Sequence, residues 1–234
     1  MTFAIKDFNV CSVNINVLCK QCQHYIRPMK NYHHGNLKEE LISCACVMCE
    51  RDGYTKLSIR SLAKESNVSQ TAPYRHFKTK KDLYAAVATD GFKKLSKAMY
   101  VDSGKKVTKK QLVEMAIKYI EFGLKNANTY DLMFGTAVGN FSPYPELLES
   151  ANSSYDNFRS SFSRLANDSD EIIAFKCITL WSVVHGLVGI LRKVQVIGDE
   201  PLMNPEDGPM SSAILIASNL NDHLDKVVSG IVNN

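Results

Sequence analysis

Long apolar runs are missing from this 234-residue sequence. No stretch approaches about 18 consecutive apolar residues, the length that a membrane-spanning helix requires. We do not expect residues 1–28 to be a secretory leader, because Asp7 and several asparagines interrupt the apolar stretch there and no basic segment precedes it. Strand-type alternation and internal repeats are also absent. We therefore expect an all-α protein of the cytoplasm with no membrane partner.

Residue groups typical of an active site are missing too. The sequence has no Ser–His–Asp or Cys–His grouping at suggestive spacing, and no glycine-rich loop of the kind that cradles phosphate. The cysteines number seven, and an odd number in a chain without a leader indicates reduced cytosolic thiols. We therefore expect neither catalysis nor a cofactor.

Two cysteine clusters could suggest a metal site, but neither has a complete ligand set. Cys44, Cys46 and Cys49 share one expected helix, where residues two apart point in nearly opposite directions, so packing in a core is the better interpretation. The segment 19–24 (CKQCQH) has zinc-like spacing, yet no second ligand pair follows it. We expect no metal.

Charge is divided unevenly along the chain. Residues 1–110 contain 20 Lys and Arg against 9 Asp and Glu, whereas residues 111–234 contain 8 against 15. A basic front half beside an acidic back half indicates that the front half alone meets a polyanion, and nucleic acid is the natural candidate.

Apolar periodicity and capping residues predict a series of helices. The first is expected over 37–51, with Asn36 and Glu39 as a capping box and Gly53 after its end. Further helices are expected over 79–100, from Thr108 onwards, from a loop at 139–145 to about 165, from Ser169 to 196, and over 211–232. Thr79 with Asp82 gives the capping pattern again, and Thr108 has Gln111 three residues later. The inner face of the helix that follows the loop is expected to carry Leu147, Leu148, Ala151, Tyr155, Phe158 and Phe162.

The most informative segment is 57–84, LSIRSLAKESNVSQTAPYRHFKTKKDLY. Ser58 can cap a short helix, and Asn67 tolerates the left-handed backbone of a tight turn. Ser69 can cap a second helix. Two short helices joined in this way predict a helix-turn-helix, whose second helix fits the DNA major groove.

Four strings stand here in one register: YHHGNL, the turn NVS, APYRHF and KTKKDLY. With them, residues 31–97 resemble the DNA-binding domain of the TetR family of bacterial transcriptional regulators. Asn67 stands where the family usually has glycine, and Pro73 lies four residues past the expected cap. The resemblance implies a flexible tail or upstream extension at 1–28, a helix-turn-helix domain at 29–101 and an effector-binding and dimerisation domain at 108–234.

Seven residues are expected to meet DNA: Ser58, Gln70, Thr71, Tyr74, Arg75, His76 and Lys80. Gln70 can pair with adenine and the methyl group of Thr71 can meet thymine. Arg75 can read guanine, hold phosphate or face solvent, and Ser58 can present its hydroxyl to a phosphate. The other three match family positions that contact the DNA backbone.

Residues 180–187, LWSVVHGL, resemble the Trp-x-x-x-His-Gly pattern of one branch of TetR-type carboxyl-terminal domains. Trp181 and His185 share a helix face, and Gly186 allows another helix to approach closely. The resemblance implies a homodimer formed by this helix and the last one, with Gly186, Gly189, Ile190 and Leu224 as interface candidates.

Large apolar side chains in the back half could surround a small apolar or amphipathic ligand, or simply form a core. The ligand-binding candidates are Met115, Tyr119, Phe122, Met133, Phe134, Tyr155, Phe158, Trp181 and His185. His185 is either a polar anchor for the ligand or a core histidine.

The leading interpretation is a repressor that binds a pseudo-palindromic operator as a homodimer and is released by a small molecule. The alternatives are a non-inducible or activating DNA-binding regulator, and a small-molecule carrier or enzyme with a DNA-binding front end.

Overall fold

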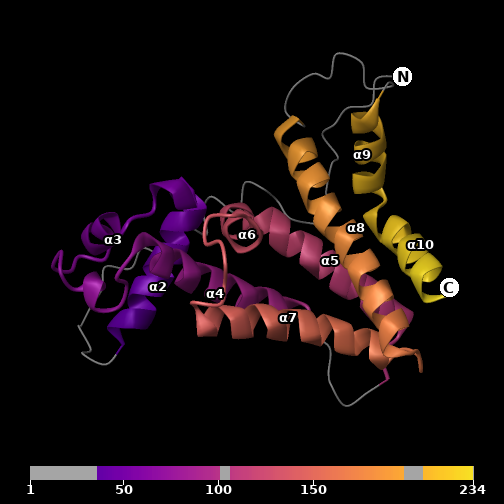
Figure 1. Ribbon diagram of the computed structural model, residues 1–234. Helices are drawn as coiled ribbons and strands as arrows, with labels where there is room; N and C mark the ends of the chain where they lie inside the picture. The colour runs from indigo at the N-terminus through magenta and orange to yellow at the C-terminus, as the bar shows by residue number, and fades with distance from the viewer. Residues whose placement is uncertain (1–35, 101–105, 198–207, 234) are drawn as a thin grey trace. The chain divides into compact units, whose positions relative to one another are not determined.

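The computed structural model describes residues 36–100, 106–197 and 208–233, and every regular element in these ranges is helical (Figure 1). This confirms the expected all-α fold class. Expectations for residues 1–35, including the segment 19–24, lie outside the described residues. The elements are α2 (Leu37–Asp52), η3 (Tyr54–Lys56), α3 (Ile59–Glu65), η4 (Pro73–Arg75), α4 (Lys80–Ala98), α5 (Lys109–Lys125), α6 (Ala127–Phe134), α7 (Pro145–Ser163), α8 (Asp170–Ile197), α9 (Pro209–Ser218) and α10 (Leu220–Val232).

Several helix ends are formed by the capping residues that the sequence indicates. At the start of α4, the Thr79 hydroxyl accepts from the backbone N–H of Asp82 (3.2 Å), whose carboxylate accepts from the N–H of Thr79 (2.9 Å). Thr108 and Gln111 form the same reciprocal pair at α5. Gly53 ends α2 with φ at +83°, a left-handed conformation that suits glycine.

Other expectations were wrong. Asn36 makes no side-chain cap at α2, so the predicted capping box with Glu39 does not form. The expected last helix is two helices, because the backbone leaves helical geometry at Asn219, whose side chain bonds the carbonyl of Leu215 instead. On α7, two residues expected to face inward are exposed: Leu148 and Tyr155.

The described chain forms two compact units. The amino-terminal unit contains residues 36–97 together with 126–155, and its core includes Leu41, Leu62, Phe77 and Val87. Thus α6, which is distant in sequence, packs with α2 and η3. At Gly91 of α4 a Cβ atom would lie 2.5 Å from the sulfur of Met133 and 2.7 Å from a methyl carbon of Thr129. The missing side chain therefore allows α6 to approach α4 closely.

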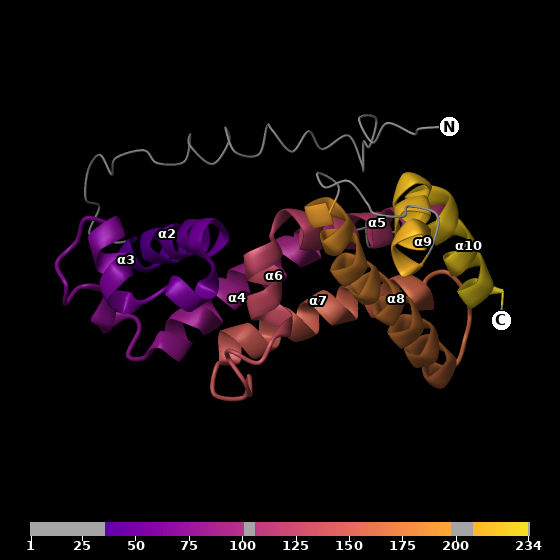
Figure 2. The ribbon, with the colours of Figure 1, turned by 90° about the horizontal axis from the view of Figure 1, so that it is seen from above.

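The carboxyl-terminal unit contains the described parts of residues 98–125 and 156–234. In it α5 packs against α8 and α10, and α9 packs against α8 (Figure 2). Two lysines hold α10. The ammonium group of Lys109 bonds Asp225 and Ser229, and the buried Lys176 bonds Asp168 and the backbone carbonyl of Val232 at the end of the helix. A cation at this end of a helix is favoured by the helix dipole.

Helix α8 is unusually apolar. Residues 170–195 are long and apolar enough to cross a membrane by length and composition. The sequence shows no uninterrupted apolar run here because a few polar residues divide a segment whose mean hydropathy is high. Only 39% of this apolar window is buried within the chain. One face packs against α5, α9 and α10, so much of the apolar surface that remains is exposed.

The close packing at Gly91 makes a testable prediction. Gly91→Ala should lower the free energy of unfolding by about 1–3 kcal/mol through overpacking, although alanine is the better helix former by about 1 kcal/mol. The matched control is Gly230→Ala, on α10, where no heavy atom beyond the neighbouring residues and the local helix backbone lies within 4 Å of the Cβ position. That change should be neutral or stabilising. Urea unfolding of both variants tests the contact, and a stabilised Gly91→Ala protein would contradict it.

Candidate nucleic-acid interface

The first helix of the predicted helix-turn-helix, α3, is capped by Ser58 as expected. The Ser58 hydroxyl accepts from the backbone N–H of Ser61 (3.0 Å), and the Ser61 hydroxyl accepts from the N–H of Ser58 (3.0 Å). Ile59, Leu62 and Ala63 are buried, so this helix has one inner face, as its periodicity predicts.

The turn after α3 depends on Asn67. Among the described residues other than glycine, it alone has a positive φ, +53°, which confirms the left-handed backbone expected there. The chain then folds back, and the N–H of Val68 reaches the carbonyl of Ala63 (3.1 Å). The turn is short because a single residue accepts this conformation.

The second segment differs from the expected α-helix. Residues 69–76 form turns and the 3₁₀ helix η4, with three-residue bonds such as Ala72 N–H to Ser69 carbonyl (3.0 Å) and His76 N–H to Pro73 carbonyl (3.0 Å). Pro73 has no N–H to donate into an α-helical ladder, which accounts for the tighter winding. The hydroxyl of Ser69, expected to cap this segment, lies 3.3 Å from the hydroxyl of Thr71.

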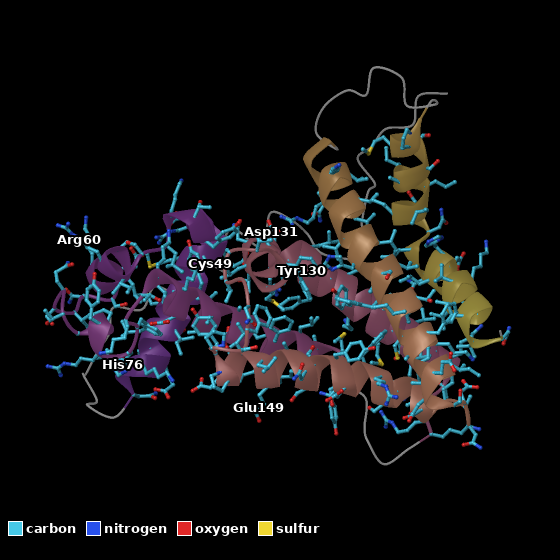
Figure 3. All side chains as sticks on the ribbon, in the orientation of Figure 1. Cys49, Arg60, His76, Tyr130, Asp131 and Glu149 are labelled. Carbon is cyan, nitrogen blue, oxygen red and sulfur yellow. The ribbon has the colours of Figure 1, made fainter. Side chains whose placement is uncertain are left out.

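This segment still has two distinct faces. Ala72, Pro73 and Phe77 are buried. The opposite face is exposed and carries the expected DNA-reading side chains: Gln70, Thr71, Tyr74, Arg75 and His76. In Figure 3 His76 points outward from this end of the unit. The segment therefore presents an amide, two hydroxyls, a guanidinium and an imidazole together on one surface.

Lys80, at the start of α4, is exposed and also held in place. Its ammonium donates to the carbonyl of Thr55 (2.9 Å) and lies 5.2 Å from the centre of the Tyr84 ring. The Tyr84 hydroxyl in turn donates to the carbonyl of Tyr54 (2.7 Å). Because an ammonium has three N–H groups, this arrangement orients the cation and leaves it able to meet an anion.

In the carboxyl-terminal unit, three of the ligand-binding candidates are hydrogen-bonded to one another. The indole N–H of Trp181 donates to the hydroxyl of Tyr119 (3.0 Å), which lies 3.2 Å from Nδ1 of His185. Burial lowers the pKa of His185 below its usual 6.5, so the ring is neutral at pH 7. The sequence predicted the face shared by Trp181 and His185 and named Tyr119 among the same ligand-binding candidates, but it did not predict the hydrogen bonds that join the three.

Comparison with known proteins assigns the helix-turn-helix region and the carboxyl-terminal region to the same family. Residues 41–87 match the family of bacterial regulatory proteins called the tetR family, and residues 112–201 match the tetracyclin repressor-like carboxyl-terminal domain. The chain belongs to the TetR family. No curated protein sequence matches it.

Solved structures share the TetR-family fold. A protein of unknown function from Rhodococcus sp. RHA1 is 23% identical, with a TM-score of 0.61 and coverage of 85% of this chain and 98% of that one. TetR from Acinetobacter baumannii AYE is 18% identical, with a TM-score of 0.53 and coverage of 81% and 93%. A TetR transcriptional regulator from Rhodococcus sp. RHA1 is 13% identical, with a TM-score of 0.50 and coverage of 82% and 97%.

As a TetR-family protein, the chain is a DNA-binding transcriptional regulator with an amino-terminal helix-turn-helix. The sequence interpretation overlooked two exposed cations next to Ser58, Lys56 and Arg60. Arg60 points outward in Figure 3, on the face of α3 opposite Leu62. The periodicity of α3 could have indicated it. Arg51, by contrast, is paired with Asp52 and Glu65, each at 2.7 Å.

The remaining ligand-binding candidates are divided between the units. Met115, Phe122 and Phe158 are buried in the same unit as the Trp181 network. Met133 and Phe134 belong to the other unit, where Met133 packs at Gly91 and the ring of Phe134 lies 5.4 Å from that of Phe92. Tyr155 is 37% exposed. The nine candidates therefore do not form one cluster within either unit.

The described cysteines support the packing interpretation. Cys46 and Cys49 are buried on α2, and burial, with the nearby charge of Glu50, raises the pKa of Cys49 to about 12. Such a thiol is not reactive at neutral pH. Within residues 36–100, 106–197 and 208–233 no three metal-ligating side chains come together.

The exposed face makes a prediction about sequence reading. Gln70→Ala should relax the preference at one base pair in each half-site by about 1–3 kcal/mol, because a bidentate base contact discriminates by that amount. Non-specific affinity and the salt dependence should stay unchanged. Binding selection on randomised DNA, with wild type and variant in parallel, measures both. Identical preferences at every position would mean that Gln70 reads no base.

Lys80→Ala should have the opposite pattern of effects from Gln70→Ala. Loss of a phosphate contact weakens binding to all sequences and should reduce the slope of log affinity against log salt by about one unit, with base preference unchanged. Because Lys80 also bonds Thr55, thermal unfolding should be measured alongside. An unchanged salt slope in a folded variant would show that Lys80 does not touch the backbone.

Proposed function

We propose that this chain is a homodimeric repressor that a small apolar or amphipathic molecule releases from a pseudo-palindromic operator. The observation that carries the DNA-binding part is the exposed face of residues 70–76, which is polar and basic and rests on the buried Ala72, Pro73 and Phe77. Ser58, Lys56, Arg60 and Lys80 flank it with further donors for phosphate. The protein would act in the cytoplasm, where its DNA is, and without catalysis.

The dimer is supported by the exposed face of α8. Ile172, Phe175, Ile178 and Ile190 are 43–66% exposed and follow one stripe of the helix. Gly186 and Gly189 lie on the same side, and beyond their neighbours and the local helix backbone no described atom of the chain lies within 4 Å of the Cβ position of either. An apolar stripe with small residues at its centre suits close packing against the same helix of a second copy. Leu224, an interface candidate from the sequence, is fully buried inside its own chain and is not available for such a contact.

The ligand-binding part of the proposal is supported by the Trp181, Tyr119 and His185 network. It places polar groups among the buried side chains of Met115 and Phe122, on the α5 helix that also carries Tyr119. A neutral imidazole and a phenol discriminate by hydrogen bonding rather than by charge, so an uncharged molecule with an oxygen or nitrogen acceptor fits this chemistry.

A mobility shift on the DNA upstream of the chain's own gene tests the whole proposal. A panel of uncharged apolar and amphipathic molecules is first screened by thermal shift, and each stabilising compound is then added to the protein–DNA complex. Loss of the shift supports a ligand-released repressor. A shift that persists with every stabilising compound favours a non-inducible regulator, whereas activated transcription from the bound promoter would identify an activator.

The proposed interface predicts the effect of two substitutions. Phe175→Lys and Gly186→Leu should each raise the dimer dissociation constant at least about tenfold, because a charge or a bulky side chain would be forced into the helix contact. Sedimentation should then show a 26.2 kDa monomer at concentrations where wild type is dimeric. Leu148→Lys, at an exposed apolar position on α7, is the control and should stay dimeric. A wild-type protein that sediments as a monomer would overturn the interface.

A further inference from the structure

The carboxyl end of α2 and the amino end of α6 cap each other. A carboxylate oxygen of Glu50, in the last turn of α2, accepts from the backbone N–H of Thr129 (2.6 Å). In return the side-chain amide of Asn128 donates to the backbone carbonyl of Glu50 (2.9 Å). Both bonds join segments almost 80 residues apart in the sequence, at 79 and 78 positions.

Each bond satisfies a group that its own helix leaves without a partner. The first N–H groups of a helix and its last carbonyls have no intrahelical partner. Asn126, at the N-cap of α6, makes no side-chain cap, and the carboxylate of Glu50 takes that role from another helix. A carboxylate at this position is also favoured by the helix dipole. In the same way, the side-chain amide of Asn128 donates to a carbonyl in the last turn of α2 that has no partner within that helix.

The packing around the two bonds extends the contact to α4. Thr129 and Met133 fill the space that Gly91 leaves on α4, and Phe134 meets the ring of Phe92 edge-on. Helix α6 is thereby attached to both α2 and α4, the helices on either side of the helix-turn-helix. Nearby, the charges of Glu50 and Asp131 both act on Cys49, which Figure 3 labels together with Asp131.

The contact between α2 and α6 matters because of the way the chain runs between the two units. The segment 126–155 belongs to the amino-terminal unit, yet the chain enters it from α5 and leaves it through α7, both of which continue into the other unit. Within the described residues, the chain also passes from the helix-turn-helix to the other unit after α4. If α6 were released from α2, its packing against Gly91 and Phe92 of α4 would remain, but α2 would no longer be docked on the segment that α5 and α7 connect to the other unit.

We propose that Glu50 and Asn128 are positioning residues for DNA binding, which fix the separation of the two helix-turn-helix segments in the dimer by docking α6 onto α2. They touch no DNA themselves. The inference rests on the proposed dimeric operator binding, because a separation has meaning only for two segments on one DNA. Its signature is the spacing between half-sites, which a side chain that only stabilises the fold would not change.

The test is a binding selection in which the two selected half-sites are joined by spacers of every length over one helical turn. Wild type should prefer one spacer, or two adjacent ones. Glu50→Ala and Asn128→Ala should reduce that preference about five- to tenfold, the effect expected when a capping hydrogen bond is lost. Glu50→Gln keeps an oxygen that can accept from Thr129 and should restore much of the preference. Salt dependence and base preference within a half-site should stay as in wild type.

Thr108→Ala is the matched control, because it removes the same kind of helix cap, at α5 in the other unit, and should lower the unfolding temperature without broadening the spacing. Should Glu50→Ala fail to fold, Asn128→Ala still decides, since alanine is a good helix former at that position. A sharp spacing preference in Asn128→Ala or in a folded Glu50→Ala protein would overturn the inference. Wild type that selects no paired half-sites would overturn the proposed function instead.

Discussion

The backbone of Asn67 is the constraint on which the proposed DNA-reading surface depends. Because this residue holds a left-handed conformation at φ +53°, the chain reverses directly after α3. The next residues then share one core with Leu62 and Ala63 through Ala72, Pro73 and Phe77. Only when that inner face is buried does the opposite face, with Gln70, Thr71 and Tyr74, become a defined surface. The exposed chemistry is thus set by a turn that its own backbone closes, with the N–H of Asn67 bonded to the carbonyl of Lys64 and the N–H of Val68 to that of Ala63.

Features with a local cause could be predicted from the sequence. The caps at Ser58, Thr79 and Thr108 join groups three residues apart, so residue type and spacing contain all the necessary information. The same signal was wrong at Asn36, where the spacing is present but the side chain makes no cap. It also missed the break at Asn219, where an amide competes for a helix carbonyl, and the 3₁₀ winding at Pro73. Each of these three features is decided by one residue, although the surrounding sequence favours a regular capped helix.

What the sequence could not give are pairs brought together by packing. Tyr119 and His185 are 66 positions apart and Glu50 and Thr129 are 79 apart, and no periodicity relates them. The aromatic candidates divide for the same reason: spacing shows that a residue faces inward, but not which interior it faces. Met133 and Phe134 therefore looked equivalent to Met115 and Phe122, although they pack against Gly91 and Phe92 of α4 in the amino-terminal unit. A cap supplied from another helix also has no local signature at all.

Dimerisation would both bury the exposed apolar surface of α8 and compensate for the small size of the proposed DNA-reading segment. In a single chain one face of α8 packs against α5, α9 and α10, and several large apolar side chains of the helix stay exposed. A recognition segment of about two turns offers few base contacts, and specific binding needs several, each of which discriminates by about 1–3 kcal/mol. In the proposed dimer the exposed stripe around Gly186 would be buried and the number of base contacts doubled. Doubling helps only when the two segments keep the separation of the half-sites. In the proposed dimer, rigid attachment of α6 to α2 and α4 would therefore be as necessary for specificity as the side chains that we expect to face the DNA.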